Sequence, residues 1–102
     1  MMEKGVMTTL TLVSAHIYPL QPLVESALAN EVRLLEVALR QTEARLRAFE
    51  AQYHLATSEF VTRYADGQID ETLDTIEWLG EQRMLTRIRQ KIDTLRGVHF
   101  AN

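Results

Sequence analysis

The sequence predicts an all-α protein built on a long antiparallel helical hairpin. Two runs of residues carry this prediction, because their spacings alternate between three and four, the repeat of helices that pack along one another. The first run is Leu28, Val32, Leu35, Leu39, Thr42, Leu46, Phe49 and Tyr53. The second run is Trp78, Glu81, Leu85, Ile88, Ile92, Leu95 and His99. A third observation is the composition, 46% hydrophobic and 25% charged over 102 residues, which is typical of one small globular domain.

The first long helix is expected to begin near Pro22 or Asn30 and to end at Tyr53. Proline suits a first turn because the N–H that it lacks would have no partner there, and asparagine is a competing N-cap. No glycine or proline interrupts residues 23–53. Two acid–base pairs stand in the favourable i,i+4 order along this helix. They are Glu36–Arg40 and Glu43–Arg47.

The connector predicts a short helix of its own. Thr57 or Ser58 can cap it, it extends through Tyr64, and Gly67 can adopt the left-handed geometry that ends it.

The second long helix is expected to follow an N-cap at Asp70 and to stop at Gly97. Acidic residues lie near its start and basic residues near its end, which is the order that the helix dipole favours. The acidic residues are Glu71 and Asp74, and the basic ones are Arg87, Arg89, Lys91 and Arg96.

Folding the hairpin back on itself predicts a register in which apolar residues of the two runs face each other. The facing pairs are Tyr53 with Trp78, Leu46 with Leu85, Leu39 with Ile92, and Leu35 with Leu95. Thr42 and Glu81 are polar exceptions, which can fix register at some cost in stability. The same runs would serve a closed hairpin or one that exchanges helices with a second chain, so both arrangements stay open.

The sequence divides into an N-terminal arm or short strand (residues 1–20), the hairpin domain (21–97) and a C-terminal tail (98–102). Met7–Val13 alternates polar and apolar residues, as a strand does. A lone strand needs a partner for its backbone groups, so it would pair with another chain or lie as an ordered arm, a flexible tail being the alternative.

Two apolar surfaces are left over by this hairpin. One is the start of the first helix, at Leu23, Val24 and Leu28. The other is a face of the second helix, composed of Leu73, Ile76, Leu79 and Met84. Because a two-helix hairpin buries one side of each helix, we expect a homodimer that forms a four-helix bundle, or another protein as partner.

The aromatic residues around the connector allow two interpretations. Phe49, Tyr53, Phe60, Tyr64 and Trp78 form either a small core at the tip, which we favour, or a partner-binding site that uses Phe60, Tyr64 and Trp78. A nucleic-acid patch at Arg83, Arg87 and Lys91 is a weaker alternative to ordinary solvated helix charge.

The sequence contains no arrangement that predicts catalysis. The histidines lack ligand spacing, cysteine is absent, and no glycine-rich phosphate loop occurs, so we expect no enzyme, cofactor or metal. A net charge of -3 gives no field that would attract nucleic acid or an acidic membrane. No segment approaches the ~20 apolar residues of a membrane span. We expect a cytoplasmic protein.

A pattern of apolar and capping residues lies between Phe49 and Leu79, at Phe49-Glu50, Tyr53, Ser58-Glu59-Phe60, Gly67, Asp70 and Glu77-Trp78. It resembles a pattern in small helical prokaryotic proteins that are often encoded beside a toxin-like gene and are described as antitoxins or left uncharacterised. The chain departs from it at His54, where family members tend to carry glycine. The resemblance implies a protein that binds and masks a toxin, through the arm (Thr8–Val13), the uncovered helix start or the aromatic tip. The alternative is a coiled-coil oligomerisation or adaptor protein without a toxin.

Overall fold

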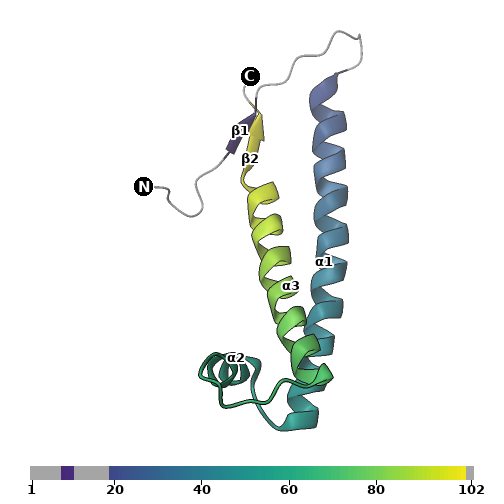
Figure 1. Cartoon of the computed structure of the whole chain (residues 1–102). Helices are drawn as coiled ribbons and strands as arrows, with labels where there is room; N and C mark the ends of the chain where they lie inside the picture. Colours follow the sequence, from purple (N-terminus) through teal and green to yellow (C-terminus); the bar gives the residue numbers. More distant parts are fainter. Residues whose placement is uncertain (1–7, 11–18, 101–102) are drawn as a thin grey trace.

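The protein is described by a computed structural model that covers residues 8–10 and 19–100. Its elements are β1 (Thr8–Leu10), α1 (Leu20–Tyr53), α2 (Thr57–Ala65), α3 (Leu73–Arg96) and β2 (Val98–Phe100). The long helices α1 and α3 pack side by side in opposite directions, and α2 lies at the connector end (Figure 1). The all-α hairpin with a short helix in its connector is therefore confirmed. None of the helices in the described ranges is long and apolar enough to cross a membrane.

The contacts between α1 and α3 follow the predicted register. The ring centroids of Tyr53 and Trp78 lie 5.7 Å apart. Leu39 and Ile92 line one shallow surface hollow, and Leu35 and Leu95 line another. We call this apolar α1–α3 contact the inner seam.

Ion pairs between the two helices replace the pairs predicted within α1. Glu36 accepts from Arg96 at 2.6 Å, and Glu43 is 3.3 Å from Arg89. Both carboxylates lie beside the inner seam, within reach of the arginines of α3, so the predicted partners Arg40 and Arg47 are not used. Neither of these two arginines forms an ion pair within the part of the chain that the structure describes.

Both long helices begin at residues other than those predicted. α1 follows Pro19 as its N-cap, which places Pro22 in the first turn, where a missing N–H still costs little. α3 is capped by Thr72 and not by Asp70. The Thr72 hydroxyl accepts from the Thr75 N–H at 3.2 Å, and the Thr75 hydroxyl accepts from the Thr72 N–H at 2.8 Å. This reciprocal box satisfies two backbone donors at once.

The main core lies at the connector end of the hairpin. Trp78 and Phe60 are each 1% exposed, and their rings stack with centroids 4.0 Å apart. Phe49 stacks against Trp78 at 5.5 Å, and Leu46 completes the buried cluster. Because these residues come from all three helices, the cluster holds α2 against the hairpin. The interpretation of the aromatics as a core is confirmed for Phe60 and Trp78, against which Phe49 and Tyr64 pack, whereas Tyr53 is 42% exposed and lies at the edge of the core.

The two strands lie at the other end of α3 and pair in parallel, with Thr8 opposite Val98. The strand predicted for the arm therefore finds its partner within the same chain, in residues assigned to a C-terminal tail. The remainder of Met7–Val13 lies outside the described residues. His99 belongs to β2, so the inner seam ends at Leu95 and does not reach the histidine. Gly97 ends α3 as predicted, which frees the following residues to extend.

Candidate protein-interaction surface

Thr57 links the three helices at the connector. Its backbone N–H donates to the Glu50 carboxylate of α1 at 2.8 Å, so a carboxylate from another helix caps α2. Its hydroxyl accepts from the Trp78 indole N–H of α3 at 3.0 Å. The residue before the helix is Ala56, whose methyl group cannot accept a hydrogen bond from the first turn. The predicted cap at Thr57 or Ser58 is thus wrong, because Thr57 is already the first helical residue.

Two left-handed residues turn the chain around α2. Gly67 has φ +72°, and the hydrogen bonds Gly67 N–H to Tyr64 C=O and Gln68 N–H to Arg63 C=O form a Schellman motif that ends α2 as predicted. His54 has φ 51° and ends α1. Glycine is the residue that adopts such geometry most easily, so a histidine is uncommon at this position.

Two tyrosines bind carboxylates around the core. The Tyr53 hydroxyl donates to Asp74, and the Tyr64 hydroxyl donates to Glu71 at 2.5 Å. These hydrogen bonds raise the pKa of both tyrosines above the ordinary value, since a phenolate beside a carboxylate is disfavoured. Tyr53 thus connects the end of α1 to the first turn of α3, and Tyr64 connects α2 to the segment just before α3.

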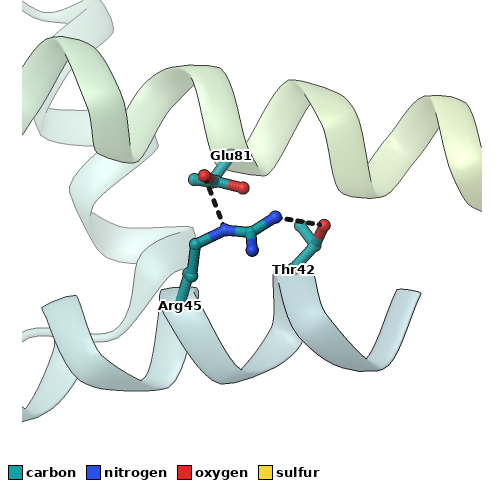
Figure 2. A network of polar contacts seen from close by, with 3 residues as sticks. All are labelled: Thr42, Arg45 and Glu81. Carbon is teal, nitrogen blue, oxygen red and sulfur yellow. Dashed lines mark hydrogen bonds and ion pairs between the residues drawn. The ribbon is translucent and has the colours of Figure 1, made fainter. Parts of the chain in front are cut away.

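A polar network crosses the inner seam at Thr42 and Glu81, the two polar positions in its apolar pattern. Thr42 is 1% exposed, and its hydroxyl accepts from the Arg45 guanidinium at 3.3 Å (Figure 2). The same guanidinium donates to Glu81 of α3 at 2.8 Å. Arg45 therefore joins the two polar positions of the seam. Reasoning from the sequence missed this residue, although its place three residues after Thr42 is a usable signal.

The predicted partner-binding residues fall into two groups at opposite ends of the hairpin. Phe60 and Trp78 are buried in the core and cannot contact a partner in this fold, which corrects their assignment. Tyr64 is half-buried beside them. Leu23, Val24 and Leu28 lie at the far end, where α1 extends beyond the last turn of α3; Leu23 is exposed and the other two are half-buried.

The predicted basic residues Arg83, Arg87 and Lys91 are exposed along α3. The leftover face of the same helix is largely open, since Leu73, Ile76 and Met84 are exposed. Leu79 packs against the core cluster and therefore does not belong to this exposed face. Among the residues that the structure describes, no group of three acidic or histidine side chains could hold a metal ion.

A surface of which the sequence reasoning identified only Leu23 runs along the outer side of α1. Its large apolar members are Leu23, Leu34 and Val37, with 62%, 58% and 42% exposure. The complete row also has alternating spacings of four and three and is exposed at every position. We call it the outer stripe: Leu23, Ala27, Asn30, Leu34, Val37, Gln41, Ala44, Ala48 and Ala51.

Comparisons with protein-family models, with curated proteins and with solved structures found no match for this chain.

Proposed function

We propose that the protein is a non-enzymatic interaction module that binds a helical protein partner through the outer stripe of α1. The observation that carries this proposal is the exposure of Leu23, Leu34 and Val37 at positions of a second heptad repeat. An exposed apolar row with this period fits the surface of a partner helix. We expect the module to act in the cytoplasm, since a chain without cysteine suits a reducing compartment.

The hydrogen bonds that polar side chains form between the helices support a structural and not a catalytic role. Glu50 caps α2, Thr57 receives the indole N–H of Trp78, and Arg45 connects Thr42 to Glu81. Each of these side chains is occupied in holding helices together. They would be poor choices for binding a substrate, because any displacement would disturb the hairpin.

A second candidate is the antitoxin-like function, in which the partner is a toxin encoded by a neighbouring gene. The left-handed conformation of His54 favours it, since it fits the glycine of the resembling proteins at the one position where the chain departs from their pattern. The other residues of the resemblance are mainly core or cap residues. They support a shared connector and leave the partner to be identified by experiment.

The test combines the mass of the purified protein by light scattering with co-expression of the neighbouring gene product. A dimer or larger species would support a self-associating module. A monomer that co-purifies with the neighbouring product would support the antitoxin-like role. A monomer that binds no such product, at concentrations up to about 100 µM, would contradict the interaction proposal as a whole.

A further inference from the structure

The outer stripe has a pattern that is complementary to itself. We propose that two copies of this chain pair through α1 in antiparallel orientation, with Asn30 of each copy facing Gln41 of the other. This inference rests on the proposed interaction function and names its partner as a second copy. Nine exposed positions in alternating four and three spacing extend along most of α1. Such a row packs against another helix along its whole length.

The layers of this pairing match in chemical kind. In the antiparallel register centred between residues 35 and 36, Leu34 faces Val37, so large apolar side chains meet on both sides of the two-fold axis. Farther out, Ala27 faces Ala44 and Leu23 faces Ala48. A large residue thus opposes a small one in the Leu23–Ala48 layer, and the Ala27–Ala44 layer is small on both sides. One more layer is formed at each end by Leu20 and Ala51.

The two amide side chains of the stripe fall in the same layer of this register. Asn30 already accepts a hydrogen bond from Arg33 through its carbonyl oxygen, at 3.2 Å. Its amide N–H groups are then directed to an acceptor, which the carbonyl of Gln41 supplies. Polar residues in a helical seam fix the register and orientation at some cost in stability. Shifting the helices by one heptad would place both amides against apolar residues.

A parallel pairing fits the same stripe less well. Every residue would face its own copy, so three consecutive layers, at Ala44, Ala48 and Ala51, would consist of alanine alone. Poorly filled layers lose the packing that stabilises a helical seam. In the antiparallel register Ala48 faces Leu23 and Ala51 faces Leu20, so the layer of Ala27 with Ala44 is the one that consists of alanine alone on each side of the two-fold axis.

Within residues 8–10 and 19–100, the other elements of the fold leave this side of α1 free. Figure 1 shows α3, α2 and both strands on one side of α1. At 3.5 residues per turn, the centres of the inner seam and the outer stripe lie about 155° apart around the helix. Two copies would therefore place four helices nearly in a row, with the two α1 helices in the middle. This differs from a bundle in which four helices surround one core.

The flanking charges give the pairing a distinctive salt dependence. Arg33 of one copy and Arg40 of the other lie at the same edge of the interface in this register. Their repulsion opposes the dimer at low ionic strength and is screened by salt. The dimer is therefore expected to strengthen as salt is raised from about 50 mM to about 500 mM, the opposite of an interface held by ion pairs.

Cysteine crosslinking tests the register directly, because the native chain contains no cysteine. Two single variants, Asn30→Cys and Gln41→Cys, are oxidised separately and as an equal mixture. The mixture is expected to form covalent dimers, because residue 30 of one copy faces residue 41 of the other. Each variant alone is expected to form none, because the two copies of the same residue lie far apart. A mixture of Asn30→Cys with Gln90→Cys, exposed on α3, serves as the matched control and is expected not to crosslink.

Self-crosslinking of Asn30→Cys alone would overturn the antiparallel register. The complementary experiment compares Leu34→Glu with Ile76→Glu, since both residues are exposed and neither change disturbs the core. Leu34→Glu is expected to weaken the dimer about tenfold or more, and Ile76→Glu to leave it unchanged. A dimer broken only by Ile76→Glu would place the interface on α3 and overturn this inference while leaving the interaction function intact. A wild-type monomer at both salt concentrations would also overturn it.

Discussion

The two ends of the hairpin differ in how they are held together. At the connector end, three helices enclose Trp78 and Phe60, and hydrogen bonds to the Glu50 carboxylate and to the Thr57 hydroxyl join the helices to one another. At the other end, α1 extends past α3, and Leu23 stays exposed while Leu28 is half-buried. The same heptad period thus gives a closed core where a third helix covers it and an open surface where none does. The connector end should dominate stability, and the outer stripe of α1 should dominate association.

The largest expected effect is that of removing the central aromatic ring. Trp78→Ala deletes a fully buried side chain that stacks on Phe60, Phe49 and Tyr53, and it leaves the Thr57 hydroxyl without its donor. We expect a loss of about 3–5 kcal/mol in the free energy of unfolding, measured by urea denaturation. In a domain this small, such a loss is enough to unfold much of the population.

The matched change at the open end is Leu23→Ala. Because this side chain is mostly exposed, its removal is expected to change stability by less than about 0.5 kcal/mol at concentrations where the chain is monomeric. Equal destabilisation by the two variants would show that the connector end is not the main source of stability.

The second effect concerns the carboxylate that caps α2. Glu50→Ala removes the acceptor of the Thr57 N–H, and Ala56 offers no replacement. We expect a loss of about 1–2 kcal/mol and faster hydrogen exchange at the first turn of α2. Glu31→Ala, an exposed glutamate of α1, is the control and should leave both unchanged. Unaltered exchange in α2 after Glu50→Ala would mean that the cap does not hold this helix.

The third effect has the opposite sign. His54→Gly relieves a side chain from left-handed geometry and is expected to stabilise the protein by about 1 kcal/mol. The same residue introduced within α1 by Ala29→Gly should cost about 1 kcal/mol, because glycine is a poor helix former. Thermal unfolding of the two variants compares them. Destabilisation by both would contradict a left-handed His54.

The comparison between the two ends also shows which features can be predicted from the sequence. The inner seam was predictable, because the spacing from Leu28 to Tyr53 is a property of one helix and requires no knowledge of its neighbours. The cap of α2 was not, since Glu50 is seven residues away from Thr57 and reaches it only after the chain has turned at His54. Similarly, Glu36 and Glu43 had equally good partners within α1, and proximity to α3 decided between them.

The outer stripe illustrates a different limit. Its spacing is as regular as that of the inner seam, but six of its nine positions are alanine, asparagine or glutamine. Such residues are common on any solvated helix, so the pattern is weak until a structure shows that Leu23, Leu34 and Val37 share one open side. The start of α3 was missed for a local reason, because Asp70 and Thr72 are both good caps and only the hydroxyl of Thr75 favours the second.

The smallest effect is a pH dependence confined to the connector end. The hydrogen bonds to Asp74 and Glu71 raise the pKa of Tyr53 and Tyr64 in the folded protein above the unfolded value of 10.0. A group whose pKa is raised by folding contributes stability that is complete below its unfolded pKa and is lost as the pH rises through its folded pKa. As the pH is raised from neutrality, these two contacts should therefore be unchanged until about pH 10 and weaken above it. The double variant Tyr53→Phe with Tyr64→Phe should lose stability less steeply than the wild type between about pH 9 and 11, as followed by urea denaturation. Parallel curves for the two proteins would show that the tyrosine–carboxylate contacts do not contribute to holding α3 at the connector.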